Sequence, residues 1–161
     1  MIILGIDPGY AILGYGLIEK RGSKLIHIKN GVIKTPANLE HAKRLLLIYN
    51  ELQSIFQSLE IAEIAIEKIF FSNNTKTAIN VAQARGIALL VAEQFSSKIY
   101  EYTPPQIKTG VSGYGKADKQ QVQTMVKMLL KLDKIPKPDD AADALAVAIC
   151  HAHSLKLQSA Y

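Results

Sequence analysis

The sequence predicts an α/β fold in which helices flank one mixed five-stranded sheet. Three observations support this prediction: short apolar runs of strand length, a change to helical spacing near residue 38, and two later strands that alternate with helices. Three consecutive strands followed by strand–helix alternation are typical of a sheet with both antiparallel and parallel pairs. The 161 residues suit a single domain, which we expect to span 1–161.

The first three expected strands span residues 2–6, 14–19 and 24–33. The first is an apolar run that ends at the Asp-Pro-Gly of residues 7–9, where Pro and Gly favour a turn. Residues 20–23, Lys-Arg-Gly-Ser, suit a hairpin turn between the second and third strands. We therefore expect a three-stranded meander in this part of the chain.

Helical spacing begins near residue 38, and Asn38 is suited to cap the helix. Leu45, Leu52 and Leu59 lie on its apolar stripe. Residues 62–66 are again apolar and strand-like, and they lead directly to Glu67. This pattern predicts one helix followed by a fourth strand.

Residues 75–96 predict a helix that is apolar almost all round. A helix without a polar face is buried on more than one side. Either the core of the protein surrounds it, or a second subunit covers it. Residues 98–102 form the fifth expected strand, which Pro104 and Pro105 end.

The C-terminal third is expected to contain two helices. A glycine-rich loop at 110–115 precedes the first, which Asp118 opens with Gln121 three positions later, a capping-box spacing. Pro136 and Pro138 then separate it from a last helix near 139–156.

Charge is distributed unevenly along the chain. The net charge is +5, and residues 98–137 hold eight lysines against three acidic residues. An acidic cluster, Asp139, Asp140 and Asp143, follows directly. This order suits an enzyme that binds phosphates and holds metal ions beside them, although a solvated lysine face is the simpler alternative.

Composition also excludes some classes of protein. No apolar run approaches the roughly 20 residues that span a bilayer, so we expect no membrane partner. The N-terminal residues lack the pattern of a signal peptide, and Cys150 is the single cysteine. We therefore expect a cytoplasmic protein.

Four carboxylates are the candidate catalytic residues. Asp7 and Glu67 each follow a strand, so they meet at one sheet edge if these strands are parallel neighbours. Asp140 and Asp143 are spaced i, i+3 and share one face of the last helix. Converging carboxylates are what two-metal phosphodiester hydrolysis requires, because Mg²⁺ prefers hard oxygen ligands.

Each acid also has a simpler explanation. Asp7 can stabilise the turn that follows it, and Glu67 can be an ordinary strand end. Asp140 and Asp143 lie in the first helical turns, where the helix dipole favours acidic side chains.

Six segments of the chain form a recognisable set: Gly5-Ile6-Asp7-Pro8-Gly9, Ala65-Ile66-Glu67-Lys68-Ile69-Phe70, Gln83-Ala84-Arg85-Gly86, Gln106-Ile107-Lys108, the stretch 113–123, and Asp140-Ala141-Ala142-Asp143-Ala144-Leu145-Ala146. Together they resemble one family, RuvC, the bacterial crossover junction endodeoxyribonucleases that resolve Holliday junctions. The resemblance runs from residue 2 to about 153. It is most specific in the glycine-loop segment and the Asp-Ala-Ala-Asp helix.

The resemblance implies an RNase H-like nuclease domain, a homodimer, and paired symmetric nicking of four-way DNA junctions. It further implies two Mg²⁺ ions per active site, with Mn²⁺ as a possible substitute, and cooperation with the RuvA–RuvB branch-migration complex. By position, the catalytic and metal-binding acids are Asp7, Glu67, Asp140 and Asp143. Tyr10 departs from the family, in which a small hydroxyl residue is common at this place.

The resemblance also implies DNA contacts and a dimer surface. Phe70 matches an aromatic residue close to the junction, and Lys108 and Lys119 match basic residues near the active site. Lys116, in the same glycine-loop segment, is a further candidate for DNA binding. The helix at 75–96 is the candidate dimer surface, with Ala78, Ala82 and Ala88 as contacts.

Two other functions remain open from the sequence. The chain could be a related RNase H-like nuclease that processes RNA, or a junction-binding protein without catalysis. Four intact acids argue against the second alternative.

Overall fold

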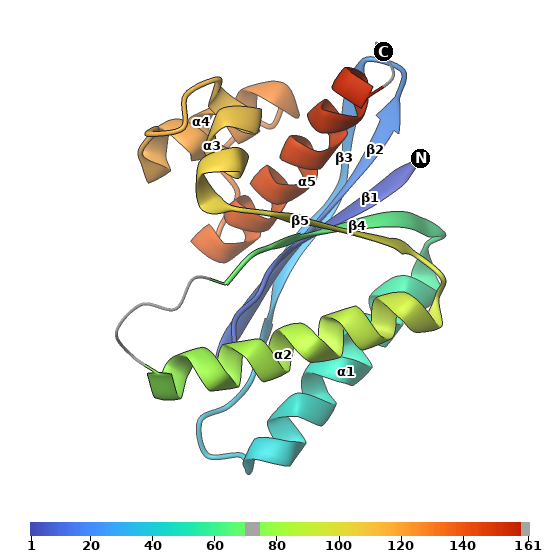
Figure 1. The fold of residues 1–161 in the computed structure, drawn as a ribbon, viewed down its shortest axis with the longest axis vertical. Coiled ribbons are helices and arrows are strands. Elements are labelled where there is room, and N and C mark those ends of the chain that lie inside the picture. The colour runs from blue at the N-terminus through green and yellow to red at the C-terminus, as the bar shows by residue number, and fades with distance from the viewer. Residues whose placement is uncertain (70–74, 159–161) are drawn as a thin grey trace.

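The structure, a computed structural model, describes residues 1–69 and 75–158 (Figure 1). Five strands form one sheet in the order β3-β2-β1-β4-β5. The β1–β2 and β2–β3 pairs are antiparallel, and the β1–β4 and β4–β5 pairs are parallel. The predicted mixed five-stranded sheet is therefore confirmed. The strands are β1 (Ile2–Asp7), β2 (Ile12–Arg21), β3 (Lys24–Lys34), β4 (Ile61–Glu67) and β5 (Lys98–Tyr102).

Helices cover both faces of the sheet (Figure 1). α1 (His41–Ser58) and α2 (Thr75–Gln94) pack on one face, where Leu4 and Ile6 point into their shared core. α3 (Pro104–Ser112), α4 (Lys119–Leu129) and α5 (Asp139–Gln158) lie on the other face. Ile3 faces this second core, as the alternation of side chains along a strand requires.

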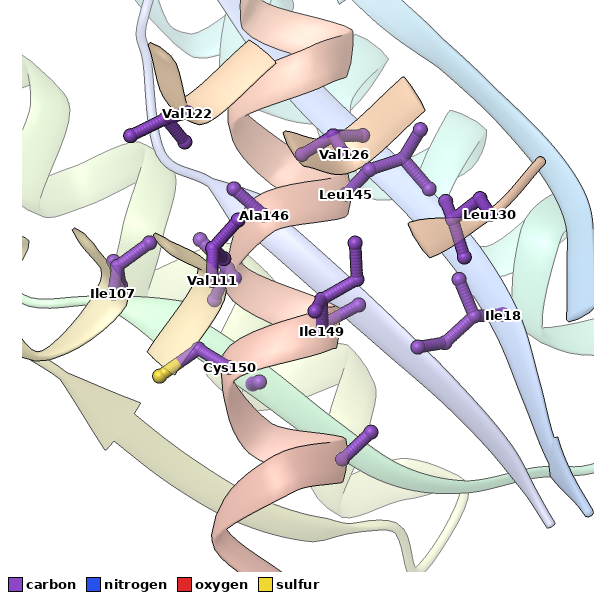
Figure 2. Close-up of a cluster of buried hydrophobic side chains, with 14 of the residues drawn as sticks. Ile18, Ile107, Val111, Val122, Val126, Leu130, Leu145, Ala146, Ile149 and Cys150 are labelled. Atoms are coloured by element: carbon purple, nitrogen blue, oxygen red, sulfur yellow. The ribbon is translucent and has the colours of Figure 1, made fainter. Parts of the chain in front are cut away.

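The second core joins the three C-terminal helices to one another (Figure 2). Ile107 and Val111 of α3 and Val126 of α4 meet Ile149 of α5, which is fully buried. This cluster fixes α3 and α4 relative to α5. Lys108 of α3 and Lys119 of α4 are thereby held beside Asp143 of α5.

Glycines let α5 lie directly on the sheet. A Cβ atom built on Gly5 would lie 2.0 Å from the Ala144 carbonyl oxygen, and one on Gly14 would lie 2.1 Å from that of Asp140. One on Gly16 would lie 2.7 Å from Leu145 Cγ. Because these three glycines of β1 and β2 have no side chain, the α5 backbone can approach the strands closely. Close approach of another backbone is one reason for glycine inside a strand.

Two helix boundaries differ from the sequence predictions. The cap predicted at Asn38 is wrong, because α1 begins at His41 and Glu40 occupies the capping position without a side-chain hydrogen bond. The sequence pattern predicts that Pro104 and Pro105 end a strand, and it does not predict α3. They do end it, but proline is also suited to the first turn of a helix, and Thr103 and Gln106 form a capping box there.

The capping box predicted for the next helix is confirmed. Asp118 accepts a hydrogen bond from the Gln121 backbone N–H (2.8 Å), and the Gln121 side chain accepts one from the Asp118 N–H (2.9 Å). α4 therefore begins where the sequence predicts. Within the described ranges, no helix is both long and apolar enough to cross a membrane.

α2 is buried on one side by its own chain. Ala84, Ala88 and Val91 are fully buried in the core that α2 shares with α1 and the sheet. Ile79 and Leu90 are exposed on another side (58% and 51%). The prediction that Ala88 contributes to a dimer surface is wrong, because this side chain points into the protein's own core. Ala78 and Ala82 are half-buried.

Candidate active site

The candidate active site lies at the edge of the sheet where β1 and β4 end. Ile6 of β1 pairs with Ile66 of β4 in the parallel ladder. Asp7 and Glu67 are the next residues of these two strands, so they lie side by side at the sheet edge. By strand alternation both side chains share a face with Ile3, and α5 covers that face. The predicted convergence of the first two carboxylates therefore follows from the parallel pairing.

α5 brings the other two acids to the same place. Asp7 pairs with Gly14 of β2, and the Asp140 backbone lies directly over Gly14. Asp140 is thus held above Gly14, the residue of β2 that pairs with Asp7. Asp143 lies one helical turn further along α5. The close approach that glycine permits is what sets this arrangement.

The four acids influence one another electrostatically. Burial and the negative charges of Glu67, Asp143 and Asp140 together raise the pKa of Asp7 to about 7, against an opposing effect of Lys119. Each of the other three acids thus acts electrostatically on Asp7. Like charges brought together in a partly buried site favour the protonated form.

Glu67 and Asp143 share a hollow with two lysines. Burial, and then the charge of Asp143, raises the pKa of Glu67, whereas Lys108 lowers it. Burial also raises the pKa of Asp143 against the opposing effect of Lys119. The hollow measures about 210 Å³, and its lining is Glu67, Pro104, Ile107, Lys108, Lys119, Val122, Asp143 and Ala146.

Lys119 pairs with the acids of α5. Its Nζ lies 3.0 Å from Asp143 Oδ2 and 3.4 Å from Asp139 Oδ2. Burial lowers the pKa of Lys119, but its hydrogen bonds and ion pairs with these acids outweigh burial and raise it above the usual value. Asp139 also pairs with Lys137 at 2.7 Å, a contact that lowers the pKa of Asp139. Asp140, rather than Asp139, acts on Asp7.

The acids suit a hard metal cation by their chemistry. All four offer carboxylate oxygens, the ligands that Mg²⁺ prefers. In the part of the chain that the structure describes, no three carboxylate, imidazole or thiolate groups are close enough to hold one ion together.

Three predicted DNA-binding residues have described positions. Lys108 and Lys119 line the hollow beside Glu67 and Asp143, where the family resemblance implies them, but Lys116 is exposed in the turn before α4 and is not part of the hollow's lining. Phe70 lies outside the described residues. The role of each in DNA binding stays a prediction.

The sequence does not identify Pro104 as a site residue, although it borders both hollows of the site. Pro8 and Lys68, which belong to the segments that match the family, line the second hollow beside Asp7 and Glu67. The glycines beneath α5 were not predicted as helix contacts either. The Gly-x-Gly pattern at Gly14 and Gly16, inside an apolar strand, was the available signal for a close helix contact.

Comparisons with known proteins show the family of the chain. A family model described as crossover junction endodeoxyribonuclease RuvC matches residues 3–151. A RuvC from Desulfitobacterium hafniense is 55% identical over 157 residues, which cover 98% of this chain and 95% of that protein. A RuvC from Clostridioides difficile is 56% identical over 158 residues, 98% and 94% of the two chains.

Solved structures support the same assignment. Thermus thermophilus RuvC in complex with Holliday junction substrate superposes with a TM-score of 0.94 at 31% identity, covering 99% of this chain and 97% of that one. The yeast mitochondrial Holliday junction resolvase superposes with a TM-score of 0.73 at 13% identity, over 99% and 80% of the chains, and shows the shared RNase H-like fold. The chain belongs to the RuvC family of crossover junction endodeoxyribonucleases, a family of metal-dependent nucleases.

Proposed function

We propose that this protein cuts four-way DNA junctions by paired, symmetric, Mg²⁺-dependent nicks. The observation that supports it most is the electrostatic coupling of Asp7 with Glu67, Asp140 and Asp143 at one sheet edge, in a chain of the RuvC family. The Thermus thermophilus RuvC that superposes on the chain was solved with Holliday junction substrate.

The four acids would hold two Mg²⁺ ions, and Mn²⁺ is an expected substitute. Bound Mg²⁺ lowers the pKa of a ligated water and neutralises charge on the phosphate during attack. The acids supply the hard oxygen ligands and fix the geometry. Asp7 must be ionised to act as a ligand, so its proton competes with metal binding, more strongly at lower pH.

Hydrolysis forms one P–O bond and breaks another. The attacking water loses a proton and its oxygen bonds to phosphorus. The sugar oxygen of the same strand, on the other side of the phosphorus, leaves and takes up a proton. Lys108 and Lys119 line the hollow beside Glu67 and Asp143, where they would bind the phosphate and offset its charge.

A pair of active sites would make the two symmetric cuts. A junction has approximate twofold symmetry, and a homodimer presents two equivalent sites to it. The exposed side of α2, with Ile79 and Leu90, is the apolar surface we assign to the second copy. Cooperation with a RuvA–RuvB complex is part of the same proposal and rests on the family resemblance alone.

One incubation tests the proposal. A synthetic mobile four-way junction, a linear duplex of the same sequence and a single-stranded RNA are each mixed with protein and Mg²⁺, and Asp7→Asn serves as the inactive control. Symmetric nicks in the junction alone, absent with the control, are expected. Cleavage of RNA would select the RNA-processing alternative, and junction binding without cleavage would select the non-catalytic one.

A further inference from the structure

The loop after Asp7 is fastened to the start of α1 by a small polar cluster. Thr35 donates its hydroxyl to the Tyr10 carbonyl oxygen (2.6 Å), and its backbone N–H bonds to the Ala11 carbonyl (3.0 Å). The Tyr10 hydroxyl and His41 Nδ1 share a hydrogen bond of 2.7 Å. This loop therefore has a fixed position beside the catalytic edge of the sheet.

Arg44 completes the cluster. Its Nε donates to the Thr35 hydroxyl oxygen (2.9 Å), and its guanidinium carbon lies 3.9 Å from the centre of the Tyr10 ring. A guanidinium that is hydrogen-bonded at one end and stacked on an aromatic face has a restricted orientation. Little conformational entropy remains to be lost when it binds a ligand.

The charge of Arg44 is not neutralised within the described residues. No carboxylate there forms an ion pair with it, and the nearby Glu40 pairs with Lys43 instead (3.2 Å). Arg44 Nη1 makes no hydrogen bond to the described residues and is not among their enclosed unpaired nitrogens. A fixed, half-buried guanidinium with free donors and no acidic partner is suited to bind an anion, and phosphate matches its fork.

The cluster lies at the same edge of the sheet as the four acids. β2 begins and β3 ends where β1 ends, so Tyr10, Thr35 and the start of α1 surround the catalytic edge. Three peptide units separate Tyr10 from Asp7, so their Cα atoms are at most about 11 Å apart. α5 and its acids cover the other face of this edge, so Arg44 lies across the sheet from Lys119.

We propose that Arg44, held by Tyr10 and Thr35, binds a DNA backbone phosphate close to the one that is cut. Lys108 and Lys119 contact the strand from the α5 face, and Arg44 contacts it from the α1 face. The strand is thereby held on both sides of the metal-binding acids. This inference rests on the proposed function, because the phosphate belongs to the junction.

Junction binding at a series of salt concentrations in EDTA tests the inference. Arg44→Gln is expected to weaken binding about three- to tenfold and to reduce the log–log salt slope by roughly 0.9, the value for one phosphate contact. Arg44→Lys keeps the charge and is expected to keep the slope. Arg21→Gln is the control, because Arg21 is exposed at the opposite end of β2 and pairs with Glu19.

The outcomes separate this inference from the proposed function. If the wild-type protein binds the junction no better than a linear duplex, the proposed function fails. If wild type prefers the junction but Arg44→Gln keeps the wild-type slope, or Arg44→Lys loses as much slope as Arg44→Gln, Arg44 only fastens the loop and the inference is overturned. Melting temperatures of both variants show whether each remains folded.

Discussion

At the scale of single residues, Asp7 is the group whose environment departs most from that of a free carboxyl. Burial and three neighbouring acids raise its pKa to about 7, although the strand and turn around it are ordinary. The sequence predicts the acid and its place at a strand end. It does not predict the raised pKa, which depends on residues as distant in the chain as Asp143.

The raised pKa of Asp7 predicts a pH-dependent gain in stability from Asp7→Asn in EDTA. The folded protein holds this proton until about pH 7, whereas the unfolded chain loses it near pH 3.8, so wild-type stability falls as pH rises between these values. The variant does not titrate there. The variant should therefore be more stable than wild type above about pH 4, by an amount that increases up to pH 7 and then stays constant. The upper limit of this difference in unfolding free energy is on the order of 4 kcal/mol, and it is seen as a higher melting temperature.

Melting curves at pH 4.5, 6 and 8 measure this difference, and Asp133→Asn is the control with the same change at an exposed acid. An advantage that does not vary with pH, or one shared by the control, would show that the pKa of Asp7 is not raised in the folded protein.

Mg²⁺ binding should release the proton that Asp7 holds below about pH 7. Because Asp7 must lose it to act as a ligand, apparent Mg²⁺ affinity is expected to fall about tenfold per pH unit below pH 7. Calorimetry in two buffers of different ionisation enthalpy measures the released proton. Affinity that is constant from pH 5.5 to 7.5 would contradict the assignment of Asp7 as a ligand.

At the scale of elements, the contact between α5 and the sheet positions the site. Gly5, Gly14 and Gly16 bring the helix backbone within contact of β1 and β2, and Asp140 lies over Gly14. The first turn of α5 is therefore aligned by the strands beneath it. A change at Gly14 should alter chemistry as well as stability.

Gly14→Ala is expected to push the start of α5 away from β2. The new Cβ would lie 2.1 Å from a backbone oxygen, which cannot rotate away. We therefore expect the free energy of unfolding to fall by about 1–3 kcal/mol or more. Displacing Asp140 and Asp143 by about 1 Å should lower the cleavage rate on the order of 100-fold.

Gly31→Ala is the matched control, because its Cβ would meet the end of the Tyr15 side chain (2.6 Å from the hydroxyl oxygen), which can move. Urea unfolding and single-turnover cleavage measure both variants. Equal losses from the two would show that the close contact under α5 does not position the acids.

At the scale of the whole molecule, the exposed side of α2 is the place where a second copy is expected. Leu90→Glu puts a charge on this side and should convert a dimer to a monomer of about 17.7 kDa, because burying an unpaired charge costs several kcal/mol. The monomer should nick junctions singly rather than in pairs. Light scattering gives the mass, and Met128→Glu is the control, because Met128 is also exposed, on α4. A Leu90→Glu dimer would place the interface elsewhere.

Most of the elements, and the chemistry of the candidate site, can be predicted from the sequence. Strand patterns, the capping box at Asp118 and the four acids are local or additive features, and each can be recognised without knowing what lies beside it. The mixed sheet followed from the order of the elements. The positions of the acids at the ends of β1 and β4 followed from the same order.

Tertiary structure alone decided which side chains meet. α2 is apolar on nearly every side, so its pattern could not show that Ala88 faces the core while Leu90 faces outward. Pro104 suits both a strand end and a first helical turn, and the capping contacts at Thr103 determined that α3 forms. The raised pKa of Asp7 and the fixed guanidinium of Arg44 both depend on long-range packing. Neither is encoded in any local pattern, because burial and the distance between charges exist only after the sheet and its helices have assembled.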